Sequence, residues 1–313
     1  MDDLADRILS GDLRAVARAA TAVENRAPGS EALLKRLFPH TGRALVAGIT
    51  GAPGAGKSTL TDQLAKLLRA GNKRVAILAV DPSSPFSGGA ILGDRVRMMD
   101  HHADPGVFIR SMATRGALGG LAAATLDLTL LLDAAGFDVI LVETVGVGQD
   151  EVEIARLADV VVVVLVPGMG DDVQAIKAGL LEIAGVFVIN KSDQPGAARL
   201  EREMAAALSL GSPNGGWTPP LIRASATLGQ GIAETLAAIL RCRDAAPLAS
   251  RGAEAWSARL RHIVCHRLFD LLPRDRLLAA AARVARRELD PYTAAGDILS
   301  YSCSFISSRE HTE

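Results

Sequence analysis

The sequence predicts an α/β fold built on a doubly wound, mostly parallel sheet, with helical extensions at both ends. Between about residues 43 and 245, short runs rich in Val, Ile and Leu alternate with amphipathic stretches. Most runs are continuously apolar, which is typical of strands buried on both faces of a parallel sheet. We predict strands over residues 44–50, 74–80, 107–110, 137–143, 159–166, 186–190 and 221–224.

The chain divides by composition into an N-terminal helical segment, a central domain and a C-terminal helical arm. In the first part, apolar residues such as Leu13 and Val16 recur at helical spacing, and we expect Ser10 to cap the second helix. After Pro247 the sequence becomes helical again and rich in Arg. We place the three parts at residues 1–42, 43–245 and 246–313.

Charge, cysteine content and hydropathy exclude several classes of protein. The 313 residues carry 34 Lys and Arg against 35 Asp and Glu, which gives no electrostatic basis for binding nucleic acid or an acidic membrane. The strongest apolar run, 160–166, is far shorter than the ~20 residues of a membrane helix, and no targeting segment is visible. The three Cys lie far apart without metal-ligand spacing. We therefore expect a cytoplasmic protein with reduced thiols and no nucleic-acid or membrane partner.

A glycine-rich loop follows the first predicted strand. Its pattern, G-x-x-x-x-G-K-[ST], lies between a strand and an amphipathic helix, the context that identifies a phosphate-binding loop. Glycines let backbone N–H groups turn toward phosphates, Lys57 reaches the β- and γ-phosphate oxygens, and Ser58 offers a hydroxyl to Mg²⁺. The nucleotide-binding residues predicted here are Gly51, Ala52, Pro53, Gly54, Ala55, Gly56, Lys57, Ser58 and Thr59.

The residues after the sixth predicted strand indicate which base is bound. Asn190, Lys191 and Asp193 form an N-K-x-D pattern, in which the Asp193 carboxylate can accept hydrogen bonds from N1–H and the 2-amino group of guanine. Adenine has no such pair of donors and would leave that carboxylate unpaired. Asn190 can tie this loop to the phosphate loop. A backbone loop that closes over guanine O6 is expected at Ser225, Ala226 and Thr227.

Carboxylates after two other strands are candidate Mg²⁺ ligands. Glu143 and Gly146 form an acid-x-x-Gly pattern, in which the acid lies beside Mg²⁺ and the glycine N–H can sense the γ-phosphate. Asp81 could also be a ligand or only a turn residue, and Asp94 a ligand or only a solvated loop acid. The predicted metal ligands are Ser58, Asp81, Asp94 and Glu143. The predicted catalytic residues are Lys57, Glu143 and Asp94.

Residues from five of these motifs come just after the ends of predicted strands. They are Gly51, Asp81, Glu143, Asn190 and Ser225. In an open α/β sheet, ligands bind beyond the carboxyl ends of the strands. We therefore expect these five residues at one edge of the sheet.

The sequence leaves open which residue positions the attacking water. Val147 occupies the place directly after acid-x-x-Gly where many guanine-nucleotide switches have Gln, and Gln149 follows two residues later. Gln149 could position the water or be an ordinary polar loop residue, so we expect slow intrinsic hydrolysis. Arg110 and Arg115 could supply positive charge in cis, or they could form structural ion pairs.

Several stretches together resemble the MeaB/ArgK family of GTPases, P-loop proteins of the SIMIBI class that are chaperones of adenosylcobalamin-dependent acyl-CoA mutases. The stretches at 79–98, 108–120 and 166–179 are far more specific than the generic nucleotide motifs. The stretches are GITGAPGAGKST (48–59), AVDPSSPFSGGAILGDRVRM (79–98), FIRSMATRGALGG (108–120), VETVGVGQDE (142–151), VPGMGDDVQAIKAG (166–179) and NKSD (190–193). DPYTAAGDIL (290–299) also looks like the C-terminal helical arm of the family.

The resemblance implies a GTPase that converts GTP to GDP and phosphate, with Mg²⁺ held by acids matching Asp81, Asp94 and Glu143. It implies a homodimer held partly by C-terminal helices, and a mutase partner whose cobalamin loading and protection the GTPase gates. A segment matching 167–179 reports the nucleotide state to the mutase. The residues implied in switching and signalling are Gly146, Gln149, Asp171, Gln174 and Lys177.

Three alternatives remain at this point. A GTPase metallochaperone that delivers metal to a metalloenzyme would share the phosphate loop, but it should show a Cys/His cluster, which the sequence lacks. An ATP-dependent protein kinase is disfavoured by N-K-x-D and by the missing kinase catalytic loop. In a non-enzymatic scaffold, the nucleotide would only stabilise the fold, and turnover measurements separate that case.

Overall fold

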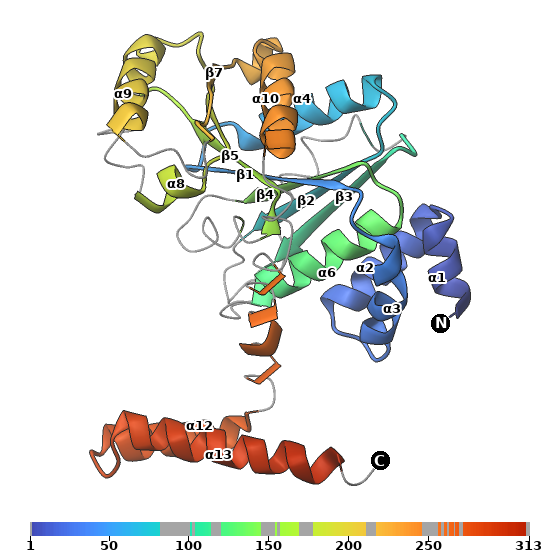
Figure 1. The fold of residues 1–313 in the computed structure, drawn as a ribbon, viewed down its shortest axis with the longest axis vertical. Coiled ribbons are helices and arrows are strands. Elements are labelled where there is room, and N and C mark those ends of the chain that lie inside the picture. Colours follow the sequence, from blue (N-terminus) through green and yellow to red (C-terminus); the bar gives the residue numbers. More distant parts are fainter. Residues whose placement is uncertain are drawn as a thin grey trace. The chain divides into compact units, whose positions relative to one another are not determined.

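A parallel sheet forms the centre of the computed structural model of this chain, with strand order β3-β2-β4-β1-β5-β6-β7 (Figure 1). Every neighbouring pair of strands is parallel, so the predicted doubly wound fold class is confirmed. Each strand coincides closely with a predicted run, although β3 extends three residues further. The strands are β1 (Leu45–Gly51), β2 (Val75–Asp81), β3 (Val107–Ala113), β4 (Val139–Thr144), β5 (Val160–Leu165), β6 (Val186–Ile189) and β7 (Leu221–Arg223).

The chain forms two compact units, residues 1–256 and 257–313. The predicted division into three parts remains a prediction. The structure describes residues 2–81, 101, 104–113, 120–144, 154, 157–168, 178–210, 217–245, 256–257, 260–261, 263–265, 267–268 and 272–310.

Helices cover both faces of the sheet in the first unit. Apolar side chains of α4 and α10 share one core with alternate residues of β1, such as Ala47 and Ile49. Helix α6 lies on the opposite face, and α2 and α3 pack against its outer side (Figure 1). The helices are α1 (Asp2–Leu9), α2 (Leu13–Glu24), α3 (Ser30–Leu37), η1 (Phe38–His40), α4 (Lys57–Ala70), α6 (Gly120–Ala134), α8 (Ala178–Ile183), α9 (Ala197–Leu210), η3 (Ala226–Leu228) and α10 (Ile232–Ala245).

The predicted cap of the second helix is wrong by two residues. Asp12 is the N-cap of α2, and its carboxylate accepts from the backbone N–H of Arg14 and Ala15. Ser10 instead donates its hydroxyl to the carbonyl of Arg7 in the last turn of α1. The chain turns between the two helices at Gly11, which adopts a φ of 80°. The second helix therefore begins after this turn, with Asp12 as its N-cap. The Arg7 guanidinium also pairs with Asp12 and lowers the pKa of that carboxyl.

Carboxylates fix the amino ends of strands β1 and β2. The buried Asp133 of α6 accepts from the backbone N–H groups of Gly42, Arg43 and Ala44, just before β1. Asp138 likewise accepts from the backbone N–H before β2, at Arg74. These bonds satisfy donors that precede the strand pairing and set where each strand begins.

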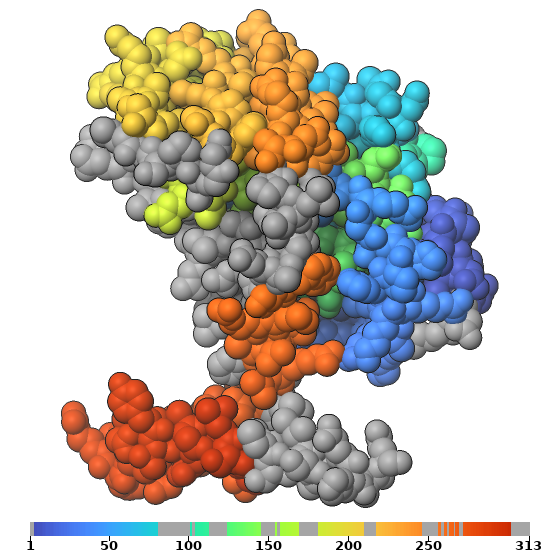
Figure 2. Space-filling model, in the orientation of Figure 1, coloured from blue at the N-terminus to red at the C-terminus, as the bar shows by residue number. Residues whose placement is uncertain are grey.

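The second unit contains a helical hairpin of α12 (Arg274–Ala285) and α13 (Pro291–Glu310). Arg287 adopts a φ of 60° in the turn, and Asp290 caps α13 by accepting from the backbone N–H of Tyr292 and Thr293. Bonds from Thr293 lower the pKa of the Asp290 carboxyl. Figure 2 shows side chains of this unit at the surface, and most of the described ones are exposed, whereas Ala294 of α13 is buried. Within the described ranges, no helix is long and apolar enough to span a membrane.

Candidate functional site

The predicted site residues that the structure describes lie where the parallel strands end. Gly51 ends β1, Asp81 ends β2, Glu143 is the penultimate residue of β4, Asn190 follows β6 and Ser225 comes two residues after β7. Because these strands are parallel neighbours in one sheet, their carboxyl ends form one edge. The arrangement is that of a ligand site at an open α/β sheet.

The phosphate loop connects β1 to α4, which begins at Lys57. The Lys57 ammonium is buried and donates to the carbonyls of Gly51, at 2.8 Å, and Ala52, at 3.0 Å. Gly51 lies so close to β5 that an added Cβ would be 2.2 Å from the carbonyl oxygen of Val164. Glycine is therefore required where the loop leaves the sheet, and the loop encircles the lysine ammonium.

Asn190 joins the phosphate loop to the two loops predicted to hold the base. Its side-chain Nδ2 donates to the carbonyl of Ala55 at 2.8 Å, and its Oδ1 accepts from the backbone N–H of Ala226 at 3.0 Å. The side chain is buried, so both bonds are protected from water. The tie between the N-K-x-D loop and the phosphate loop, expected from the sequence, is present.

Gly56 makes room for this amide, and Gly56→Ala tests the contact. A Cβ on Gly56 would lie 2.4 Å from Asn190 Nδ2, whereas one on Gly54 would meet nothing within 4 Å. Both glycines have positive φ, 85° and 77°, so Gly54→Ala is a control for backbone strain alone. We expect Gly56→Ala to destabilise the protein by about 1–3 kcal/mol more than Gly54→Ala in urea denaturation. Equal losses would contradict the tight contact between Gly56 and Asn190.

Asp193, the predicted guanine-reading residue, is oriented by a hydroxyl from the next strand end. Ser225 Oγ donates to Asp193 Oδ1 at 2.6 Å, and Ser225 is fully buried while Asp193 is exposed. Lys191 has a φ of 54°, which turns the chain sharply between Asn190 and Asp193. The sequence predicts Ser225 in a backbone loop over guanine but does not predict this side-chain contact. A serine at the end of the strand next to N-K-x-D is the only sequence signal for it.

Two of the predicted metal ligands contact each other. Ser58 Oγ, in the first turn of α4, donates to Glu143 Oε1 at 2.6 Å, and the Glu143 side chain is buried. Asp81 ends β2, which is the neighbour of β4. A hydroxyl and carboxylates form a set of hard oxygen donors, the kind that Mg²⁺ prefers. The Ser58 hydroxyl and the Glu143 carboxylate fit a magnesium ion.

The remaining predicted residues lie outside the part of the chain that the structure describes. These are Asp94, Gly146, Gln149, Asp171, Gln174 and Lys177, together with Arg115. Their predicted roles stay predictions. Among the described residues, no three His, Cys, Asp or Glu side chains gather as a metal site.

Arg110, one of the candidate cis cations, forms a structural ion pair. It lies on β3, the edge strand, and its Nε donates to Glu24 Oε2 of α2 at 3.0 Å, with a second guanidinium nitrogen on the same oxygen. A further nitrogen donates to the Thr21 hydroxyl of α2. Of the two alternatives left open by the sequence, the ion pair is therefore the one observed.

Arg110→Met should destabilise the fold without slowing GTP hydrolysis. The side chains of Arg110 and Glu24 are only 17% and 14% exposed, so the substitution leaves a largely buried carboxylate without its cation. We expect a loss of about 3 kcal/mol in urea denaturation. Arg36→Met is the control, because the Arg36–Asp6 pair is exposed and should be worth less than about 1 kcal/mol. A drop in the hydrolysis rate of folded Arg110→Met would assign this arginine a role in the reaction instead.

Comparisons with known proteins agree with the resemblance seen in the sequence. Residues 16–281 match the family model of the methylmalonyl-CoA mutase-associated GTPase MeaB. A Pyrococcus abyssi protein assigned as a GTPase is 48% identical, over 96% of both chains. The GTPase ArgK of Escherichia coli is 38% identical over 92% of both chains. A mouse protein, the mitochondrial methylmalonic aciduria type A homolog, is 38% identical over 75% of this chain and 61% of its own length.

The fold agrees as well. The crystal structure of an LAO/AO transport system kinase superposes with a TM-score of 0.71 at 31% identity, covering 98% of this chain and 97% of that one. The family model spans both the phosphate loop and the guanine motif. Membership of a GTPase family implies that the chain binds GTP and GDP. The chain belongs to the MeaB family of methylmalonyl-CoA mutase-associated GTPases and is a P-loop GTPase.

Proposed function

We propose that this GTPase is a chaperone of an adenosylcobalamin-dependent acyl-CoA mutase of the methylmalonyl-CoA mutase type. GTP hydrolysis would gate the loading of cobalamin into the mutase and its protection there, in the cytoplasm. The observation that carries the proposal is the match of residues 16–281 to a family described as mutase-associated. The likeness to the methylmalonic aciduria type A homolog, over 75% of this chain, supports the same partner.

The geometry of the site supports a division of labour in GTP hydrolysis. The backbone from Gly51 to Ser58, with Lys57, would hold the phosphates, and Asp193 would hold the guanine. Magnesium would be held by Ser58, Asp81, Asp94 and Glu143, and when bound it supplies positive charge that offsets the charge on the β- and γ-phosphates. Lys57, Glu143 and Asp94 are the proposed catalytic residues. Lys57 would contribute by placing its ammonium against the transferred phosphoryl group.

The signal to the mutase would come from GTP hydrolysis, which removes the γ-phosphate from the nucleotide. GTP and GDP differ in contacts to the γ-phosphate, which can order a segment that relaxes after hydrolysis. The proposed switch and signalling residues are Gly146, Gln149, Asp171, Gln174 and Lys177. Since binding equilibria are linked, a nucleotide that alters mutase affinity requires the mutase to alter nucleotide affinity by the same factor.

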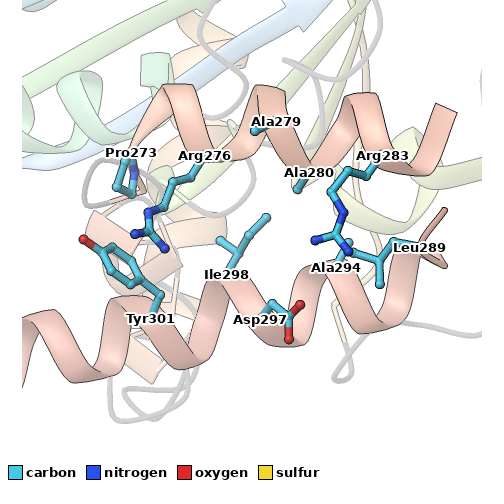
Figure 3. Close-up of a pocket in the computed structure, with 10 residues that line it drawn as sticks. All are labelled: Pro273, Arg276, Ala279, Ala280, Arg283, Leu289, Ala294, Asp297, Ile298 and Tyr301. Atoms are coloured by element: carbon cyan, nitrogen blue, oxygen red, sulfur yellow. The ribbon is translucent and has the colours of Figure 1, made fainter. Parts of the chain in front are cut away.

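A homodimer through residues 246–313 is the second part of the proposal, and the hairpin of α12 and α13 supports it. The apolar side chains of Leu277, Leu278, Tyr292 and Leu299 are 45%, 62%, 89% and 52% exposed. The two helices also leave a cavity of about 240 Å³ between them, into which Arg276 and Arg283 point beside Ile298 and Tyr301 (Figure 3). Two helices alone bury too little apolar surface to form a hydrophobic core, so a second copy of the hairpin would complete that core.

The mutase partnership is tested by turnover and by binding. The GTP turnover of this chain is measured alone and with a methylmalonyl-CoA mutase, and mutase binding is measured with GTP, with GDP and without nucleotide. We expect the mutase to raise turnover and its affinity to depend on the nucleotide. If turnover and affinity are the same in all arms, the chaperone proposal is wrong, although the GTPase activity would stand.

Sedimentation of Leu278→Asp and Tyr292→Asp against the unmodified chain tests the dimer, which these charges should weaken.

A further inference from the structure

The backbone pairing of strands β1 and β4 ends at the edge of the sheet that carries the site. Their register runs from Leu45 opposite Val139 to Ile49 opposite Glu143. Beyond that point β1 continues against β5, with Gly51 opposite Val164, while β4 continues against β2, with Thr144 opposite Val80. The end of the pairing of β1 with β4, after Ile49 and Glu143, is the fork.

The fork divides the site into two halves. On one side, β1, β6 and β7 lead into the phosphate loop and the guanine-recognition residues. On the other side, β4 carries Glu143 as its penultimate residue and β2 ends in Asp81, and these are the proposed metal acids. Nucleotide binding and the placement of the metal acids therefore belong to different strand groups, which must be held in register for the reaction.

A pair of buried hydroxyls spans the fork. Thr144 Oγ1 donates to Thr50 Oγ1 at 3.0 Å, and these residues are 3% and 0% exposed. Side chains alternate between faces along a strand, so Thr50 lies on the opposite face from Ile49, which packs with α4. Glu143, which bonds Ser58 of α4, likewise lies on the opposite face from Thr144. One side-chain bond therefore links the halves on each face of the sheet.

We propose that Thr50 and Thr144 are positioning residues, whose hydroxyl pair holds the β4 half of the site at the distance from the phosphate loop that GTP hydrolysis requires. The proposal rests on the metal role proposed for Glu143. The bond lies just past the last backbone pairing of β1 with β4, and a water-free hydroxyl pair is stronger than one in solvent. Losing it would let the end of β4 shift relative to Ser58 while the phosphate loop and guanine loops stay tied through Asn190.

The test uses Thr50→Val and Thr144→Val, which remove a hydroxyl and keep the shape of the side chain. We expect each variant to lower kcat about fivefold to tenfold, with the KM for GTP changed less than about twofold. The affinity for GDP, measured by calorimetry in EDTA, should match that of the unmodified chain, because the nucleotide-holding half is untouched. The double variant should lose no more than either single variant, since both remove the same bond.

Two further variants separate positioning from mere stability. Thr144→Ser restores the hydroxyl and should restore kcat. Thr129→Val removes another buried hydroxyl, on α6, that donates to the carbonyl of Leu126, and it should leave kcat unchanged at a similar cost in melting temperature. Unchanged kcat in both Thr→Val variants would overturn the proposal, as would multiplying effects in the double variant or a parallel loss of GDP affinity.

The failure of this inference is distinguishable from failure of the metal role of Glu143. Glu143→Gln should remove hydrolysis and the effect of Mg²⁺ on nucleotide affinity. If it does so while the threonine variants behave like the unmodified chain, only the positioning role is wrong. If Glu143→Gln remains active, the metal role itself is wrong, and the threonine pair loses the residue through which it acts.

Discussion

Lys57→Ala is expected to reduce GTP hydrolysis by about 10³-fold, the largest effect that we predict for a single substitution in the phosphate loop. The ammonium is buried and encircled by the loop, with bonds to the carbonyls of Gly51 and Ala52. From that position the ammonium can reach the phosphates of a bound nucleotide. Among the described residues, no other cation is held by this loop. Single-turnover measurements with radiolabelled GTP would determine the rate.

The loss should be chemical and not a consequence of unfolding. Removing the two bonds to the carbonyls should cost less than about 2 kcal/mol in urea denaturation, which leaves the fold intact. Lys66→Ala is the matched control on the same helix: Lys66 is 40% exposed and pairs with Asp62, so its loss should leave hydrolysis unchanged. Retained hydrolysis in folded Lys57→Ala would remove Lys57 from the catalytic residues.

Asp193→Asn is expected to exchange the preferred base. In the proposed site the carboxylate would accept from two donors of guanine, whereas the amide of Asn would turn its NH₂ group toward one of them. We expect the affinity for GTP to fall by about 10²-fold or more. Xanthosine triphosphate has a carbonyl in place of the 2-amino group and should bind the variant better than GTP does.

Measuring the affinity for xanthosine triphosphate makes this test independent of folding, because a misfolded variant would not gain affinity for that nucleotide. Ser225→Ala is the companion variant: it removes the bond that orients Asp193, so it should weaken GTP binding without favouring xanthosine. Competition against a fluorescent guanine nucleotide would measure all three proteins. An unchanged preference for guanine in Asp193→Asn would show that another residue reads the base.

The sheet was predictable because a parallel strand buried on both faces is a local signal. Val160–Leu165 is almost pure valine, and the structure buries nearly all of it. The prediction for β3 ended early because Ser111 and the residues after it lack a strand pattern. Their pairing with β2 extends the strand through Ala113, and such pairing is a property of the sheet.

Apart from the tie of Asn190 to the phosphate loop, the contacts described between residues far apart in the chain could not be predicted. Arg110 pairs with Glu24, 86 residues earlier, and Thr144 bonds Thr50 across 94 residues. The sequence around Arg110 or Thr144 does not identify the residue it contacts, because each contact forms only once the strands and helices are packed. The phosphate loop and N-K-x-D differ in this respect: their chemistry depends on residues within a few positions of each other, so the pattern alone carries it.

Calorimetric titration of the unmodified chain with GTP, GDP and ATP tests the central claim most directly. In the proposed site, the Asp193 carboxylate would bind guanine and the loop from Gly51 to Ser58 would bind the phosphates. Both guanine nucleotides should therefore bind, and ATP should bind at least about 10²-fold more weakly than GTP. Equal affinity for ATP and GTP would contradict the account.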